Sequence, residues 1–179
     1  LSDEKNRLLG TIIVMQDVSE LKKAYAELEN MVIYDQLTGV YSMYSFMEHC
    51  KQYDEYNGSV AVVVCDINHL SDINIQYGQK AAGNQALINV AGVLKKILMD
   101  RAYIARINEG DFVAVMKNVT DAEADKTFEQ IKRTVEKECN NGKLGVTIEY
   151  GIAMRKASNR WIMDIVHEAV NDMRDRKGR

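Results

Sequence analysis

Hydrophobic and polar residues follow two different periods in this chain, and the period changes several times along its 179 residues. Apolar residues three or four positions apart are typical of helices with one buried face. They predict helices at residues 43–53, 79–100, 121–138 and 161–176, with a shorter helical or irregular segment at 67–77. Apolar or β-rich runs predict strands at 60–65 and 144–154, and a hairpin at 103–116. We therefore predict an α/β (α+β) fold, in which helices flank a central sheet that contains an antiparallel hairpin.

The first 34 residues combine a strand-like run with a helical seam. Residues 11–16 have the composition of a strand, and one strand cannot fold alone, so we expect it to belong to an upstream domain or to dock elsewhere. Asp17 or Ser19 can cap the helix that follows, and Gly39 is a candidate C′ glycine at its end. The apolar seam of this helix has heptad spacing and consists of Leu21, Tyr25, Leu28 and Val32. It predicts either a parallel coiled-coil dimer or a helix packed on its own domain.

Composition narrows the class of protein. Hydrophobic residues make up 46% of the chain and charged residues 27%, which indicates a globular domain with a sizeable core. The net charge of −3 does not favour nucleic-acid binding, because such proteins usually present a basic face. No apolar run approaches the ~20 residues that span a bilayer, so we expect no membrane contact by this segment. Three cysteines lack metal-ligand spacing and are expected to be reduced, mostly buried thiols of a cytoplasmic protein: Cys50, Cys65 and Cys139.

The polar centre of the predicted hairpin is a candidate site. Asn108, Glu109, Gly110 and Asp111 separate its two apolar arms. Such a turn would hold the Glu109 and Asp111 carboxylates at an exposed tip, where they could bind a hard cation and, through it, phosphate. A solvated turn is the alternative, because Asn, Gly and Asp are common turn residues for conformational reasons. Asp66 is a further candidate, since it follows a buried strand at the end where a charge can reach solvent.

Three stretches, in order and at compatible spacing, resemble the GGDEF family, the bacterial diguanylate cyclase domain. They are Asp-Gln-Leu-Thr-Gly-Val-Tyr at 35–41, Asp-Ile-Asn-His-Leu-Ser-Asp-Ile-Asn at 66–74 with Ala-Gly-Asn at 82–84, and Ala-Arg-Ile-Asn-Glu-Gly-Asp-Phe at 105–112. The resemblance covers about residues 31–179 and implies a nucleotide-cyclase-like GGDEF fold for a domain at 35–179. Residues 1–17 resemble the last strand of a PAS-type sensor domain, and residues 18–34 resemble the signalling helix often placed between such a sensor and a GGDEF domain.

The resemblance also implies a reaction and a set of site residues. Two GTP molecules, one per subunit of a dimer, would form cyclic di-GMP and release pyrophosphate with the help of Mg²⁺ or Mn²⁺. The metal positions of the family correspond to the Asp66 side chain and the Ile67 carbonyl, together with a signature carboxylate. Asn74 corresponds to the residue that reads guanine. Further nucleotide-binding positions correspond to Asn84, Asn108, Gly110 and Arg174.

The signature departs from the family pattern at several positions. Gly110 stands third, where the family has a carboxylate that binds metal and serves the attack. Asn108 and Glu109 replace two glycines that let the backbone lie close to the nucleotide. A one-residue shift of the turn could bring Glu109 or Asp111 to the metal, so these two are the catalytic candidates, with Asp111 also a metal candidate. Such a shift would flip the flanking residues to the other face of the sheet.

We therefore expect a degenerate GGDEF domain without diguanylate cyclase activity, which acts as a dimerising or GTP-binding regulatory module. Residues 18–34 would form the dimer contact. An active cyclase with an altered signature is the alternative, and a pure interaction module with a vestigial pocket is a third hypothesis. The family's product-inhibition motif, Arg-x-x-Asp, would run from Met99 to Ala102 and is absent.

Overall fold

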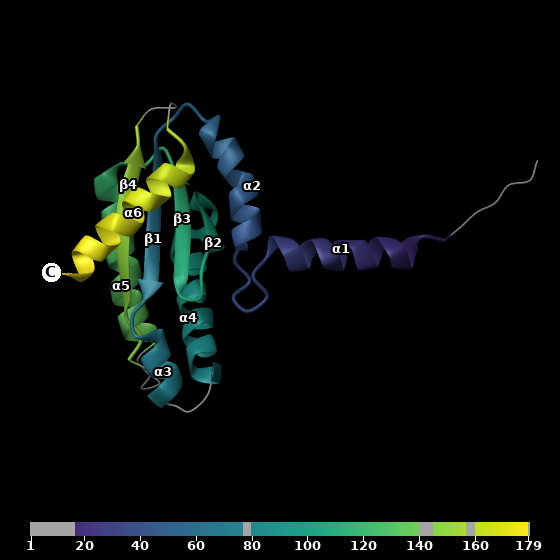
Figure 1. The fold of residues 1–179 in the computed structure, drawn as a ribbon, viewed down its shortest axis with the longest axis horizontal. Coiled ribbons are helices and arrows are strands. Elements are labelled where there is room, and N and C mark those ends of the chain that lie inside the picture. Colours follow the sequence, from purple (N-terminus) through teal and green to yellow (C-terminus); the bar gives the residue numbers. More distant parts are fainter. Residues whose placement is uncertain (1–16, 77–79, 140–144, 157–159, 179) are drawn as a thin grey trace, which may run out of the picture. The chain divides into compact units, whose positions relative to one another are not determined.

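The computed structural model describes residues 17–76, 80–139, 145–156 and 160–178. The chain divides into two units, Leu1–Asn30 and Met31–Arg179, and the second contains the sheet (Figure 1). The described helices are α1 (Ser19–Ile33), α2 (Met43–Asp54), α3 (Leu70–Gln76), α4 (Lys80–Leu98), α5 (Asp121–Cys139) and α6 (Ile162–Lys177), with a short 3₁₀ helix, η1, at Met99–Arg101. The described strands are β1 (Val60–Ile67), β2 (Ala102–Arg106), β3 (Asp111–Lys117) and β4 (Ile148–Arg155).

The strands form one antiparallel sheet in the order β2-β3-β1-β4. The unbroken apolar sequence of β1 follows from its central place, because helices cover both of its faces. Side chains 60–64 of β1 are all fully buried. The fold class predicted from the sequence is therefore confirmed, including the hairpin, whose arms are β2 and β3.

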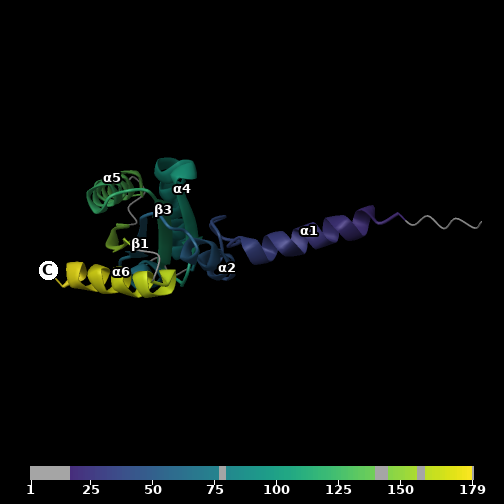
Figure 2. The same cartoon turned by 90° about the horizontal axis from the view of Figure 1, so that it is seen from above.

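Helices on both faces give the second unit three layers (Figure 2). Successive residues of β1 point to opposite faces, so each face has its own core. The core between the sheet and helices α4 and α5 includes Val63, Cys65, Leu94 and Phe128. The opposite core, between the sheet and helices α2 and α6, includes Phe46, Val62, Val64 and Ile165.

Most element boundaries agree with the sequence pattern, and two do not. The sequence pattern predicts Gly39 as the C′ residue of the first long helix, but α1 ends at Ile33. Gly39 instead has a left-handed φ of +63° in a turn, where its N–H donates to the Asp35 carbonyl at 2.8 Å. β4 begins at Ile148, later than predicted; the predicted start at 144 lies outside the described residues, and Gly145 has a left-handed φ of +60°, which a strand does not adopt.

Some predicted features fall on residues that the structure does not describe. The strand predicted at 11–16 lies outside the described residues. All three cysteines are buried free thiols, as predicted. Burial raises the pKa of the Cys50 thiol to about 11, which keeps it protonated at neutral pH. Among the described helices, none is long and apolar enough to cross a membrane.

Helix α6 lies unusually close to the sheet at Gly151 of β4. A Cβ placed on Gly151 would lie 2.1 Å from the Ala169 carbonyl oxygen and 2.2 Å from the Met173 nitrogen. These are backbone atoms of α6, so they cannot rotate away as a side chain would. The start of the helix is held separately, because the Ile162 N–H donates to Asp54 Oδ1 at 2.7 Å. Glycine at 151 therefore sets the distance between α6 and the sheet.

We predict that Gly151→Ala destabilises the domain, because α6 must move to admit the methyl group. Overpacking of this kind costs about 1–3 kcal/mol of unfolding free energy. Urea denaturation followed by circular dichroism measures the loss. Gly92→Ala is the matched control: Gly92 is exposed within α4, and a Cβ placed on it would have no neighbouring atom within 4 Å. The control should stabilise by about 0.5–1 kcal/mol through helix propensity; equal behaviour of the two variants would contradict the account.

Candidate functional site

Strand register places three carboxylates in one row at the same end of the sheet. Asp66 of β1 lies opposite Asp111 of β3 on one side and opposite Glu149 of β4 on the other. Directly opposed residues of antiparallel strands have neighbouring side chains on one face. Asp66 and Asp111 are predicted site residues, and the structure brings them together. Glu149 was not predicted, because its place in the row depends on long-range pairing.

Lysines from two helices neutralise two members of this acidic row. Lys177, the last residue of α6, contacts Asp66 Oδ2 through its ammonium group. Lys132 of α5 donates to Glu149 Oε1 at 2.6 Å. Both pairs are only partly exposed, so they are less weakened by solvent than pairs on an open surface.

Asp111 is held by a neutral partner instead. The Asn108 amide donates to Asp111 Oδ2 at 3.1 Å. Burial raises the pKa of Asp111 above its ordinary value, and the neighbouring Asp66 adds to the rise, while the Asn108 hydrogen bond and Lys177 act in the opposite direction. The raised pKa of Asp111 therefore comes first from burial, and the charge of Asp66 is a smaller cause.

The hairpin tip is fixed through its backbone. Arg106, at the end of β2, donates from Nε to the Asn108 carbonyl at 3.2 Å and from Nη2 to the Glu109 carbonyl at 2.8 Å. The Ile67 N–H donates to the Gly110 carbonyl at 3.2 Å. The tip is thus tied to both β2 and the end of β1. The Glu109 side chain is exposed, whereas Asp111 is only partly exposed at the start of β3.

The same arginine joins the tip to the first motif of the chain. Arg106 Nη1 lies 3.2 Å from Asp35 Oδ2, and Asp35 Oδ1 also accepts from the Thr38 N–H at 2.9 Å and the Thr38 hydroxyl at 2.6 Å. Burial alone would raise the pKa of Asp35, but the two Thr38 hydrogen bonds and the Arg106 guanidinium together lower it. Asp35 therefore fixes its own turn and anchors Arg106.

The residues expected to read guanine lie on α3 and α4. Asn74 Oδ1 accepts a hydrogen bond from the Gly83 N–H at 3.1 Å. A Cβ on Gly83 would stand 2.4 Å from that oxygen, so glycine is needed for this approach. The structure thus places Asn74 against the Ala-Gly-Asn stretch at 82–84, while the Asn84 side chain is exposed. Arg174 is also exposed, and the α6 residue that contacts Asp66 is Lys177.

The residues at the metal positions do not fit a divalent cation. Mg²⁺ at nucleotide sites is held by one or two carboxylates and by phosphates, so Asp66, Asp111 and the Ile67 carbonyl would be a minimal set. The Lys177 ammonium, however, already contacts Asp66, and Gly110 contributes no side chain. Across the described ranges, no three His, Cys, Asp or Glu side chains gather in a group that could hold a metal ion.

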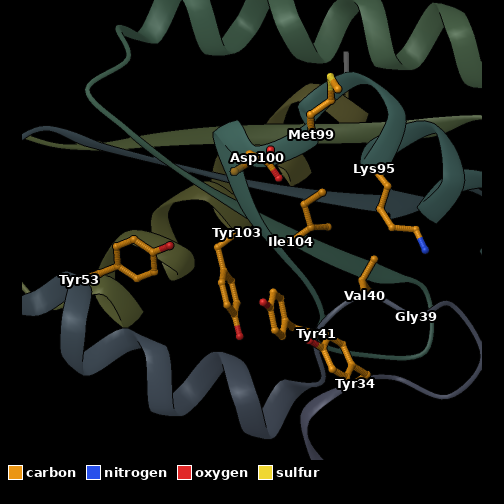
Figure 3. A pocket seen from close by; sticks show the side chains of 11 residues that line it. Tyr34, Gly39, Val40, Tyr41, Tyr53, Lys95, Met99, Asp100, Tyr103 and Ile104 are labelled. Carbon is orange, nitrogen blue, oxygen red and sulfur yellow. The ribbon is translucent and has the colours of Figure 1, made fainter. Parts of the chain in front are cut away.

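A cavity of about 430 Å³ lies at the β2 edge, away from the acidic row (Figure 3). The rings of Tyr41 and Tyr103 stack in it with centroids 4.2 Å apart, and Tyr34 stacks on Tyr41 at 5.1 Å. Met99 and Ala102, the ends of the absent product-inhibition motif, also line it. The stacked tyrosines pack the segment after α1 against β2, so the aromatic rings have a structural role here.

Besides Glu149 and Lys132, two further charged residues of the site were missed in the sequence, Arg106 and Lys177. Arg106 stood within a motif but had no assigned role, although a lone arginine beside a polar turn was a usable signal. Lys177 gave no signal, because basic residues are common in the last turn of any helix. Only the packing of α6 on the sheet brings it to Asp66.

Fold and site together define an α+β domain with an acidic row at the end of its central strand and a clamped hairpin tip beside it. The family description "Diguanylate cyclase, GGDEF domain" matches residues 32–179. The chain therefore belongs to the GGDEF family.

Individual relatives agree with this assignment. The chain is 27% identical over 163 residues to the cyclic di-GMP phosphodiesterase PdeB of Shewanella oneidensis, covering 88% of this chain and 18% of that protein. It is 25% identical over 157 residues to the probable diguanylate cyclase DgcF of Escherichia coli O157:H7, covering 86% of this chain and 33% of that protein. The chain thus spans a third or less of these two curated relatives.

A solved structure shows the same fold. The coiled coil and GGDEF domain of DgcB from Caulobacter crescentus, crystallised in complex with c-di-GMP, superposes with a TM-score of 0.80 over 90% of each chain. The sequence identity is 22%, so this likeness concerns the fold.

We predict that Asp35→Asn destabilises the domain in a pH-dependent way. The folded-state pKa of Asp35 is lowered, so its contribution is complete above its ordinary pKa of ~4 and is lost as the pH falls through the folded value. At neutral pH the variant should lose about 1–2 kcal/mol of unfolding free energy, and the loss should shrink in acid. Urea titrations across this pH range measure it. Glu136→Gln, an exposed carboxylate of α5, is the control and should change stability by less than about 0.5 kcal/mol.

Proposed function

We propose that this is a degenerate GGDEF domain that does not condense GTP. It acts as a dimerising or GTP-binding regulatory module of a bacterial protein in cyclic di-GMP signalling. The single observation that carries the proposal is Gly110, which leaves the third signature position without a carboxylate beside Asp66. Phosphoryl transfer depends on cations that stabilise developing charge, so the loss of a metal carboxylate costs on the order of several kcal/mol of transition-state stabilisation.

The geometry around Gly110 supports this proposal. A Cβ at residue 110 would lie 2.9 Å from Asp66 Oδ1, so a side chain there would point at the metal position of the family. The strand register is intact on both sides of the tip, with Asp66 opposite Asp111 and Arg106 opposite Phe112. A one-residue shift of this register, which would place the Glu109 or Asp111 carboxylate at the metal position, is therefore disfavoured.

The two residues before Gly110 also support the proposed loss of GTP condensation. Asn108 and Glu109 stand where the family has glycines, and any Cβ narrows the approach of backbone to nucleotide. The Asn108 amide is bonded to Asp111, and the Glu109 carboxylate is exposed at the tip, where it would repel a triphosphate. If GTP binds, Asn74 and the backbone of the neighbouring Gly83 would hold it, and no metal ion would be placed for catalysis.

Cyclic di-GMP signalling is the setting that the relatives favour. One relative is named a cyclic di-GMP phosphodiesterase and another a probable diguanylate cyclase, so both names concern this nucleotide. The chain covers only part of each, which is compatible with one module of a longer protein. The last strand of an upstream PAS-type sensor at residues 1–17 and a cytoplasmic location belong to the proposal.

Dimerisation through residues 18–34 is the proposed role of α1. Leu28 and Val32 of its heptad seam are exposed, and so is Met31 beside them. Apolar seams of this kind are buried by pairing with a second helix. The DgcB structure, in which a coiled coil accompanies a GGDEF domain, supports the same arrangement here.

An active cyclase with an altered signature is the second candidate function. The observation in its favour is that Asp66 and Asp111 oppose each other in register, so two carboxylates meet at the strand ends. This alternative requires that Asp66→Ala and Asp111→Ala each abolish the product.

We predict that the protein forms no cyclic di-GMP from GTP with either Mg²⁺ or Mn²⁺, because the third signature position offers no metal ligand. Chromatography of the nucleotides after incubation gives the answer, with a blank without protein as the reference. Steady accumulation of cyclic di-GMP, lost in both alanine variants, would replace the proposed function by the alternative.

A further inference from the structure

The two carboxylate oxygens of Asp66 face different surroundings. Oδ2 contacts the Lys177 ammonium, whereas Oδ1 faces the tip backbone 2.9 Å from where a Cβ on Gly110 would stand. The pair is partly buried, with 33% of the Lys177 side chain and 27% of the Asp66 side chain exposed. One oxygen of Asp66 thus contacts a cation of the chain itself, and the other faces Gly110, which has no side chain.

We propose that Lys177 is the resident cation of this site and excludes a divalent metal ion from Asp66. The inference rests on the proposed function, since it explains how the acidic row is held without a metal. Lys177 then has a role that the sequence did not assign, and the chain's own side chains complete the site.

The position of Lys177 follows from the packing of α6. Arg176, the preceding residue, donates from Nη1 to Asp125 Oδ1 and from Nε to Asp172 Oδ2, both at 2.9 Å. Its guanidinium also lies 4.8 Å from the centre of the Tyr150 ring. These contacts fix the last turn of α6 against α5 and β4. The fixed last turn of α6 therefore places Lys177 at the end of β1.

Charge balance supports the same role. Two lysines serve the row of three carboxylates, since Lys177 contacts Asp66 and Lys132 contacts Glu149. A divalent ion at Asp66 would lie beside the Lys177 ammonium, and the repulsion would be strong in a partly desolvated site. Metal binding therefore requires that Lys177 leave Asp66. Removing its charge should make the site more receptive to a metal.

The test measures Mn²⁺ binding to the full chain by electron paramagnetic resonance, without nucleotide. Lys177→Met keeps the length and apolar stem of the side chain and removes the charge. We expect it to bind Mn²⁺ at least tenfold more tightly than the unaltered protein, and we expect Lys177→Arg to behave like the unaltered protein. Lys96→Met is the matched control, because Lys96 also pairs with a carboxylate, Glu138 at 2.8 Å, but is far more exposed. It should leave Mn²⁺ binding unchanged.

Two results would overturn the inference: equal Mn²⁺ binding by the Lys177→Met variant and the unaltered protein, or tight binding by the unaltered protein. Circular dichroism checks that the variants fold, and Lys177→Gln replaces the methionine variant if that one does not. Failure here is distinct from failure of the proposed function. Cyclic di-GMP formation by the unaltered protein would refute the proposed function and with it the inference, whereas unchanged metal binding in Lys177→Met without any cyclic di-GMP formation would refute the role of Lys177 alone.

Discussion

Antiparallel register is the constraint on which this site depends. Pairing of β1 with both β3 and β4 puts Asp66 between Asp111 and Glu149, so three negative charges must share one end of the sheet. Such a row is stable only where positive charge or hydrogen-bond donors reach it. Here α6 supplies Lys177 and α5 supplies Lys132, one helix from each layer. The packing that builds the core therefore also determines the electrostatics of the site.

The shape of the hairpin tip is largely independent of its side chains. Arg106 binds the carbonyls of Asn108 and Glu109, and Ile67 binds the carbonyl of Gly110. Backbone carbonyls are present whatever the residue, so the signature can change its chemistry while the tip keeps its anchors. This explains how a chain can retain the family fold with an altered signature. The shape of this turn therefore depends less on the signature side chains than on its backbone contacts.

How far the sequence predicts the structure depends on the range of the interactions involved. Helices and strands followed from local periodicity, and Asp66 followed from its place at the end of a buried strand. Asn74 and Gly83 came from a motif whose spacing reflects a direct hydrogen bond. Glu149 and Lys177 could not be found in this way, because strand pairing and helix docking bring them to the site from distant segments. Gly39 was misplaced because a glycine with positive φ suits a helix end and a tight turn equally well.

Gly110 and Lys177 are best understood together. An acidic side chain at residue 110 would point at Asp66 and add a fourth negative charge to the row. One ammonium group could then not neutralise the carboxylates around Asp66, and a divalent cation would be the better counter-ion. With glycine at 110 the row has only three negative charges. The Lys177 ammonium group, at the end of α6, can then neutralise the Asp66 carboxylate. In the proposed account, the absence of a carboxylate at residue 110 and the contact of Lys177 with Asp66 are therefore linked, because together they would let a side chain of the protein neutralise Asp66 in place of a bound ion.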